Sequence, residues 1–217
     1  MLVIFDCDGV LVDSEPLANT CFARALQREG LDWNVEETMR RLMGRSMKSC
    51  VEIVEGELGR DLPADFVERL QVDTLQAFRD APLRTVPGVV EAIDAIEAAG
   101  IDTCVASSGS LDKMRVTLGI TGLWSRFEGR IFSSSQVPRG KPFPDLFLHA
   151  AIQLNVQPFA CSVVEDSLPG LQAARAAGMR ALAYVGATYS DAAALQAAGG
   201  RTFEAMSSLP MLAWSGS

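Results

Sequence analysis

The sequence has fewer basic than acidic residues, no closely paired cysteines and no long apolar run. Its 217 residues include 19 lysines and arginines against 27 aspartates and glutamates, with one histidine and a formal net charge of −8. Because affinity for nucleic acids depends mainly on clustered lysine and arginine, this balance argues against a nucleic-acid partner. No segment approaches the roughly 18 uninterrupted apolar residues of a membrane span, so we expect no membrane association.

The cysteines form neither a disulfide framework nor a zinc site. They are odd in number, widely spaced and without a C-x-x-C pair. The apolar start of the chain meets Asp6 after five residues, which is too short for the core of a signal peptide. We therefore expect a cytoplasmic protein with reduced thiols, whose oligomeric state the sequence does not indicate. The five cysteines are Cys7, Cys21, Cys50, Cys104 and Cys161.

The chain does contain a regular alternation of apolar runs and amphipathic stretches. The continuous apolar run at residues 2–5 predicts a strand buried on both faces, as in a parallel sheet covered by helices. Beyond Pro87 and Gly88 the alternation predicts an α/β fold, a Rossmann-like three-layer sandwich with a parallel sheet. The predicted strands there are 101–106, 130–132, 161–164 and 181–185, and the predicted helices are 111–118, 144–154 and 190–198.

An inserted helical segment separates the first predicted strand from the others. About sixty residues after Ser14 show apolar residues at helical spacing and no convincing strand. We therefore predict a discontinuous core domain, residues 1–13 and 82–217, and a helical domain at residues 14–81.

Polar residues stand where the predicted strands end, and in open parallel sheets ligands bind at the carboxyl ends of the strands. Each polar segment alone is compatible with an ordinary turn or loop. Carboxylates at the ends of apolar strands require a compensating charge, which Mg²⁺ can supply, and a lysine with hydroxyl donors suits a phosphate. The segments are Asp6-Cys7-Asp8-Gly9, Ser107-Ser108-Gly109-Ser110, Gly140-Lys141-Pro142 and Glu165-Asp166-Ser167.

These segments resemble, in the same order, the four motifs of the haloacid dehalogenase superfamily of phosphoryl-transfer enzymes. Residues 6–14 resemble the D-x-D-G-x-x-x-D-S/T signature, and residues 105–108 resemble the serine or threonine motif at a strand end. Residues 140–142 resemble the lysine motif, and residues 165–167 resemble the acidic motif. The resemblance covers nearly the whole chain.

The resemblance implies a role for each residue of the first motif. Asp6 would be the nucleophile that forms an aspartyl-phosphate and would also be a Mg²⁺ ligand. Asp8 would protonate the leaving group and later activate water, while its backbone carbonyl binds the metal. Gly9 would keep the loop backbone close to the bound phosphate.

The other three motifs complete the implied site. Ser107 would donate a hydrogen bond to the transferring phosphoryl group, and Ser108 beside it is a candidate for substrate binding. Lys141 would offset the negative charge around the nucleophile and the phosphate. Asp166, together with Glu165 either directly or through water, would complete the Mg²⁺ site.

The helical insertion resembles the small cap of the β-phosphoglucomutase-like branch of this superfamily, with hinges at residues 13–16 and 82–88. Arg45 and Lys48 are the best candidates for substrate contact from the cap. The mutase has a histidine in the first cap helix and an arginine on a cap loop. This sequence has Ala18 and Met47 at those places, although Arg45 and Lys48 are near enough to replace the arginine.

These departures favour a phosphatase that hydrolyses small phosphomonoesters, with sugar phosphates as the first candidates. A sugar phosphate mutase is the alternative, and a sensor that binds a phosphorylated metabolite without turnover is a minority alternative. Asp8 argues against two related chemistries of this superfamily. A dehalogenase does not need the second acid, and phosphonate hydrolases of this type have a small residue in its place.

Overall fold

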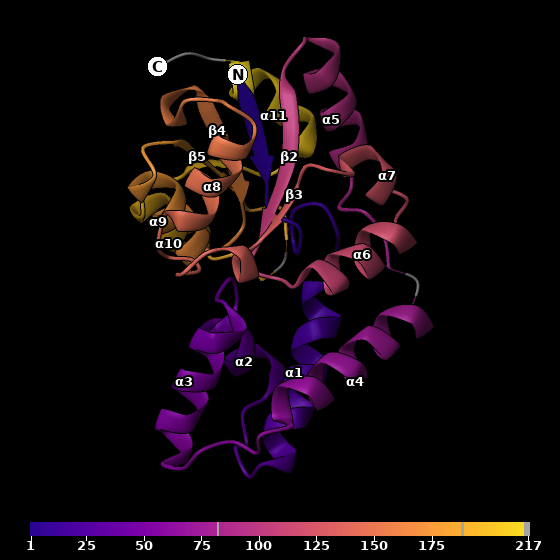
Figure 1. Ribbon diagram of the computed structural model, residues 1–217, viewed down its shortest axis with the longest axis vertical. Coiled ribbons are helices and arrows are strands. Elements are labelled where there is room, and N and C mark those ends of the chain that lie inside the picture. Colours follow the sequence, from indigo (N-terminus) through magenta and orange to yellow (C-terminus); the bar gives the residue numbers. More distant parts are fainter. Residues whose placement is uncertain (82, 188, 215–217) are drawn as a thin grey trace.

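The computed structural model describes residues 1–81, 83–187 and 189–214 of the chain (Figure 1). Over these residues the strands are β1 (Leu2–Phe5), β2 (Asp102–Ser107), β3 (Ile131–Ser133), β4 (Cys161–Glu165), β5 (Arg180–Tyr184) and β6 (Arg201–Phe203). The helices are α1 (Glu15–Arg28), α2 (Val35–Leu42), α3 (Met47–Leu58), α4 (Phe66–Asp80), α5 (Val89–Ala98), α6 (Leu111–Ile120), α7 (Trp124–Phe127), α8 (Asp145–Gln153), α9 (Leu168–Ala176), α10 (Ala192–Ala197) and α11 (Leu209–Trp214). Short 3-10 helices lie at Ser134–Gln136, Pro158–Ala160 and Met206–Ser208.

The described strands form one parallel sheet in the order β3-β2-β1-β4-β5-β6. The first strand of the chain is central, because Leu2 pairs with Asp102 of β2 on one side and with Cys161 of β4 on the other. Since parallel strands in register end at the same edge of the sheet, the residues that follow β1, β2 and β4 become neighbours.

Alternate side chains of β1 enter two different hydrophobic cores. Val3 and Phe5 pack with α5, α6, α7 and α11 on one face of the sheet. Leu2 and Ile4 pack with α8, α9 and α10 on the other face. All four side chains are at most 1% exposed, which explains why the run is apolar without alternation. The predicted three-layer α/β fold is confirmed, although β6 was not among the predicted strands.

Helices α1–α4 lie beyond the carboxyl ends of the strands, at the bottom of Figure 1, and have a core of their own. That core includes Phe22, Leu26 and Leu70 and no residue of the sheet. Two chain segments join these helices to the sheet side by side, since the backbone N–H of Asp13 donates to the carbonyl of Arg84 over 3.0 Å. Pro82, where we expect the core domain to resume, lies outside the described residues.

The composition led us to expect reduced thiols and no membrane-spanning segment. Each of the five cysteines is buried as a free thiol. Among the described residues, no helix combines the length and the apolar character needed to cross a membrane.

Candidate active site

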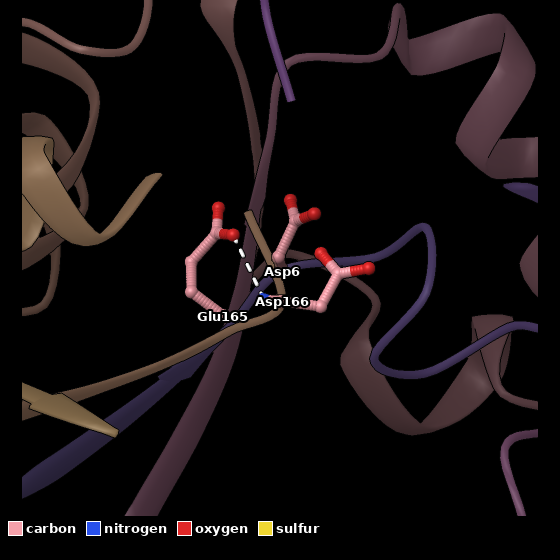
Figure 2. A group of neighbouring side chains, drawn as sticks. All are labelled: Asp6, Glu165 and Asp166. Atoms are coloured by element: carbon pink, nitrogen blue, oxygen red, sulfur yellow. Dashed lines mark hydrogen bonds between the residues drawn. The ribbon is translucent and has the colours of Figure 1, made fainter. Parts of the chain in front are cut away.

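Three buried carboxylates meet at the carboxyl edge of the sheet (Figure 2). Asp6 follows β1, Glu165 ends β4, and Asp166 comes directly after it. Because β1 and β4 pair residue for residue up to Phe5 and Val164, their ends bring these side chains together. One oxygen from each carboxylate lies within 4.8 Å of the others.

Lys141 links two of these carboxylates. Its Nζ donates to Oδ1 of Asp6 over 2.8 Å and to Oε1 of Glu165 over 2.5 Å. The side chain is 1% exposed and its ammonium lies 5.1 Å from the ring centre of Phe147. Burial opposes the charge of Lys141, but Asp6 and Glu165 raise its pKa above the usual range for lysine. Lys141 is therefore a fixed positive charge beside the nucleophile candidate.

The second oxygen of Glu165 organises the backbone that follows β4. Oε2 accepts hydrogen bonds from the backbone N–H of Asp166 and from both the backbone N–H and the hydroxyl of Ser167. With Lys141 on its other oxygen, the Glu165 carboxylate is fully engaged by protein groups. Its position makes it a support for the site, able to reach an ion through a water molecule.

Asp6 and Asp166 carry negative charge that the protein only partly compensates. Burial, followed by repulsion from Glu165 and Asp8, raises the pKa of Asp6 to about 7 despite the opposing effect of Lys141. Burial and repulsion from Glu165 also raise the pKa of Asp166 well above its usual value. Oδ2 of Asp166 is buried and has no hydrogen-bond partner among the described residues. This oxygen-rich donor set fits a divalent cation such as Mg²⁺, which would compensate both carboxylates.

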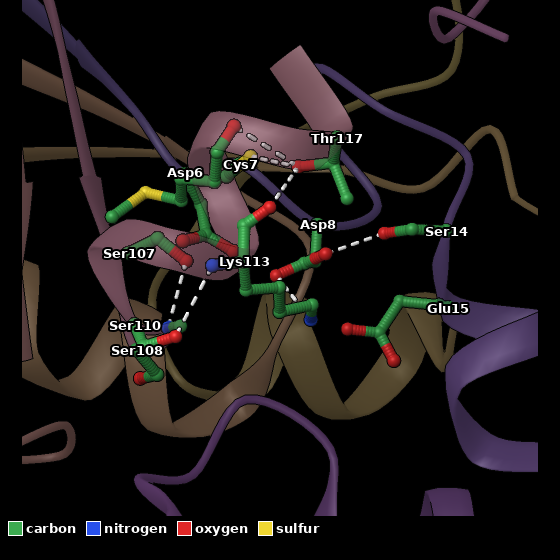
Figure 3. A network of polar contacts seen from close by, with 12 residues as sticks. Asp6, Cys7, Asp8, Ser14, Glu15, Ser107, Ser108, Ser110, Lys113 and Thr117 are labelled. Carbon is green, nitrogen blue, oxygen red and sulfur yellow. Dashed lines mark hydrogen bonds and ion pairs between the residues drawn. The ribbon is translucent and has the colours of Figure 1, made fainter. Parts of the chain in front are cut away.

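The side chain of Asp8 lies between Lys113 and Ser14, the residue that precedes α1 (Figure 3). Its Oδ1 accepts a 2.5 Å hydrogen bond from the hydroxyl of Ser14, and its Oδ2 lies 2.8 Å from Nζ of Lys113. Burial favours the neutral form of Asp8, but Lys113 and Ser14 outweigh it and hold the pKa below its usual value. Both oxygens of Asp8 therefore contact groups that favour its ionised form.

Gly9 is required by the close approach of its loop to Asp166. The residue has a φ of +77°, and a Cβ there would overlap the Asp166 carboxylate. Its backbone N–H donates to the carbonyl of Val12 over 2.8 Å, which closes the loop after β1. Only glycine combines this backbone conformation with the absence of a side chain.

The end of β2 contributes two serines with different surroundings. Ser107 is 1% exposed, and its hydroxyl accepts a 3.2 Å hydrogen bond from the backbone N–H of Gly109. The hydroxyl of Ser108 donates to the carbonyl of Gly44 in the loop between α2 and α3, over 3.1 Å. Ser108 therefore links the sheet edge to the helical insertion.

A cavity of about 280 Å³ lies between this edge of the sheet and helices α1–α4. Asp6, Asp8, Ser107 and Lys113 line it on the sheet side. Its opposite wall is mostly apolar, with a few polar side chains. That wall contains Phe22, Leu42, Met43, Met47, Val67, Leu70 and Leu75, together with Glu15, Asn19, Arg45, Gln71 and Thr74.

The sequence-predicted site residues separate into three groups in the structure. Asp6, Lys141, Glu165 and Asp166 are in contact or close together, and Asp8 lies beside them. Gly9 approaches Asp166, while Ser107 and Ser108 line the cavity. Arg45 also lines the cavity, but Lys48 is exposed on α3 and is not among the lining residues.

Two charged residues that line the cavity were not predicted from the sequence. Lys113 forms the ion pair with Asp8 described above, and Glu15 is the half-buried first residue of α1. Burial, followed by repulsion from Asp8, raises the pKa of Glu15 to about 7. Glu15 directly follows the first motif and could have been suspected, whereas nothing in the sequence separates Lys113 from a surface lysine.

The parallel sheet, with buried carboxylates and a lysine at its carboxyl edge, is suited to bind a cation and a phosphate group side by side. The family model for haloacid dehalogenase-like hydrolases matches residues 1–178, and the chain belongs to this family.

Named relatives agree with that assignment. The 6-phosphogluconate phosphatase of Escherichia coli strain K12 is 33% identical over 177 residues, which cover 82% of this chain and 79% of the relative. A phosphorylated carbohydrates phosphatase of Thermotoga maritima is 32% identical over 198 residues, covering 91% and 90% of the two chains. A solved haloacid dehalogenase family hydrolase from Deinococcus radiodurans, with bound phosphate and sodium, is 30% identical with a TM-score of 0.72, covering 96% and 92%.

Proposed function

We propose that this chain is a Mg²⁺-dependent phosphatase that hydrolyses small phosphomonoesters, with sugar phosphates as the first candidates, through an aspartyl-phosphate on Asp6. The observation that carries the proposal is the Asp6 carboxylate, which Lys141 holds through Oδ1 in the wall of a cavity that Asp8 and Ser107 also line. The two curated relatives, one of which acts on 6-phosphogluconate and the other on phosphorylated carbohydrates according to their names, support the substrate class.

In the first step a carboxylate oxygen of Asp6 attacks phosphorus and forms a new P–O bond. The bond between phosphorus and the ester oxygen breaks, and that oxygen takes a proton from Asp8. Lys141 offsets the negative charge that accumulates on the phosphoryl group, and the hydroxyl of Ser107 donates a hydrogen bond to it.

In the second step a water molecule attacks the phosphorus of the aspartyl-phosphate. Asp8 is now ionised and accepts a proton from that water, while the P–O bond to Asp6 breaks. The products are inorganic phosphate and the original Asp6 carboxylate, with Asp8 protonated for the next cycle.

The metal would be held by Asp6, Asp166 and the backbone carbonyl of Asp8, with Glu165 acting through water. When bound, Mg²⁺ supplies the positive charge that allows a carboxylate to approach a phosphate dianion. The Oδ2 atom of Asp166 supports this ligand set, because no donor among the described residues reaches this buried acceptor.

Helices α1–α4, within residues 14–81, would act as a cap that covers the cavity and excludes water during the first step. The hydrogen bond from Ser108 to the carbonyl of Gly44 supports this role, since it joins the sheet edge to the insertion. Residues on the cap wall would then select the leaving group.

A mutase is less well supported than a hydrolase. Ala18 and Met47 both line the cavity, so the positions that correspond to the histidine and the arginine of the mutase carry side chains without polar groups here. A sensor without turnover is also less well supported, since each motif position to which the resemblance assigns a catalytic or metal-binding side chain carries that side chain.

The test is phosphate release from a panel of hexose phosphates, phosphoglycolate, nucleotides and an aryl phosphate, with Mg²⁺ or with a chelator, and with and without a sugar bisphosphate. We expect Mg²⁺-dependent release in the wild type and none from Asp6→Asn, with a circular dichroism spectrum like that of the wild type. Asp112→Asn, an exposed aspartate of α6, is the matched control and should retain activity. Activity in Asp6→Asn would exclude Asp6 as the nucleophile, and isomerised product without phosphate release would support the mutase.

A further inference from the structure

Glu15 and Asn19 form a fixed pair on the cap wall of the cavity. Both residues line the cavity and come from the first turns of α1. Nδ2 of Asn19 donates to Oε2 of Glu15 over 2.6 Å and to the backbone carbonyl of Glu15 over 2.9 Å. Asn19 is 5% exposed, so its side chain has little freedom. The amide of Asn19 therefore holds the Glu15 carboxylate in one orientation.

The pair leaves only hydrogen-bond acceptors open toward the cavity. Both hydrogens of the Asn19 amide are used on Glu15, and among the described residues no donor reaches Oε1 of Glu15 or Oδ1 of Asn19. Above its pKa of about 7 the Glu15 carboxylate is ionised, and then both it and the amide oxygen of Asn19 accept hydrogen bonds without donating them. The nearby ammonium of Lys113 is paired with Asp8. This part of the wall is therefore suited to a group that donates hydrogen bonds and unsuited to an anion.

The position of Glu15 determines which part of a substrate it would meet. Figure 3 shows the Glu15 carboxylate facing the side chains of Asp8 and Lys113, and all three residues line the cavity. In the proposed reaction, the ester oxygen departs next to Asp8. The substrate carbon atoms attached to that oxygen would then enter the part of the cavity that Glu15 lines.

We propose that Glu15, held by Asn19, accepts a hydrogen bond from a hydroxyl group on the carbon next to the ester carbon of the substrate. The preferred substrates are then phosphomonoesters of neutral polyhydroxylated alcohols, and esters with a carboxylate at that carbon are disfavoured by repulsion. Glu15 is the specificity-determining residue, and Asn19 is a positioning residue. The inference rests on the proposed function, because it requires a phosphomonoester bound at Asp6.

Three esters with the same two-carbon chain isolate this contact. They are 2-hydroxyethyl phosphate, ethyl phosphate and phosphoglycolate, which place a hydroxyl, a hydrogen and a carboxylate at the position in question. We expect kcat/KM of the wild type with Mg²⁺ to be about 10- to 100-fold higher for the hydroxyl ester than for ethyl phosphate, the range of one hydrogen bond to a charged group. Phosphoglycolate should be the poorest of the three.

Variants of Glu15 and Asn19 test whether Glu15 recognises the substrate hydroxyl or only supports the start of α1. In Glu15→Ala, kcat/KM for the hydroxyl ester should be within about threefold of kcat/KM for ethyl phosphate. In Glu15→Gln, kcat/KM for phosphoglycolate should rise relative to that for ethyl phosphate. Asn19→Ala should reduce the hydroxyl preference in part. Each ratio is measured within one variant, so a loss of folded protein does not affect it.

Glu36→Gln is the matched control, because Glu36 is an exposed first-turn glutamate of α2 that does not line the cavity. Its ratios should equal those of the wild type. Equal kcat/KM for the three esters in the wild type, or wild-type ratios in Glu15→Ala, would overturn the inference and leave the proposed function intact. Failure of the wild type to release phosphate from these esters and from an aryl phosphate would overturn the proposed function together with the inference.

Discussion

Nζ of Lys113 lies 2.8 Å from Oδ2 of Asp8, while the hydroxyl of Ser14 donates to the other oxygen. In the proposed reaction, Asp8 must give up a proton in one step and accept one in the next. Lys113 favours the ionised form, which is the form that accepts the proton of the attacking water. The ion pair therefore bears directly on the second step.

Replacing Lys113 by methionine should impair that step. Without the ammonium, burial dominates and the pKa of Asp8 rises, so that the carboxyl stays protonated to higher pH. We expect kcat at pH 7 to fall about 10- to 100-fold and the acidic limb of the pH–kcat profile to move to higher pH. Steady-state kinetics between pH 5 and pH 9 would measure both effects. Lys113→Arg retains the charge and should recover part of the rate, whereas an unchanged acidic limb in Lys113→Met would contradict this role.

Lys113 also shows where sequence reasoning ends. The residues at the strand ends could be predicted because an apolar run at residues 2–5 sets the end of β1, and parallel pairing then places the ends of β2 and β4 beside it. Lys113 and Glu15 lie on helices instead. Whether a helical side chain faces the cavity depends on how its helix packs, and no local sequence signal reports that packing.

The same limit explains two other differences. Strand β6 was not predicted because it has only three residues, of which Phe203 alone is buried, so it lacks an apolar run. Lys48 was a candidate for substrate contact because it stands near the cap loop. Helix α3 lines the cavity with Met47 and Cys50. Lys48 lies about 100° from Met47 around the helix axis and so is on a different face.

This difference between Arg45 and Lys48 leads to a second prediction. Arg45 lines the cavity, with its Nε donating to the carbonyl of Arg41 over 3.1 Å. We expect Arg45→Ala to raise KM for hexose phosphates about three- to tenfold, the effect of one exposed polar contact, with little change in kcat. Lys48→Ala should leave both constants unchanged. Initial-rate kinetics on both variants would decide, and a larger effect of Lys48→Ala would refute the placement of the two side chains.

The buried carboxylates give a third prediction, on stability. Burial raises the pKa of Asp6 from 3.8 to about 7 and also raises that of Asp166, so the folded protein binds more protons than the unfolded chain. By linkage, the free energy of unfolding without metal should fall as the pH rises from about 4 to about 7, by roughly 2–4 kcal/mol. Urea unfolding across this range in a chelator would measure the decline.

Mg²⁺ should reduce this decline, because it binds the ionised carboxylates of the folded state only. The pKa of Glu15 is also raised, to about 7, so Glu15 adds its own loss of unfolding free energy as the pH rises. This part of the loss should persist with Mg²⁺ and be absent from Glu15→Gln. Asp166→Asn removes the unpartnered carboxylate and should be more stable than the wild type in chelator at pH 7.5. It should gain little from Mg²⁺. Equal stabilisation of Asp166→Asn and the wild type by Mg²⁺ would argue that the ion binds elsewhere.

The last prediction concerns the contact between Gly44 and Ser167, which brings the loop between α2 and α3 against the sheet edge. Gly44 has a φ of +76°, and a Cβ there would overlap the side chain of Ser167. Ser167 cannot easily move away, because its hydroxyl donates to Glu165 over 2.8 Å. Gly44→Ala should therefore hold the insertion away from the sheet edge, admit water and lower kcat/KM by at least about tenfold.

Gly59→Ala provides the matched control for this substitution. Gly59 has a φ of +65°, but a Cβ there would meet no atom within 4 Å. Gly59→Ala should lose about 1 kcal/mol of unfolding free energy because alanine is strained at positive φ, and Gly44→Ala should lose at least as much, as thermal unfolding would show. Only Gly44→Ala should lose activity, since only there does the new methyl group meet the sheet edge. If the two variants were equally active, closure of this loop on Ser167 would not be required for turnover.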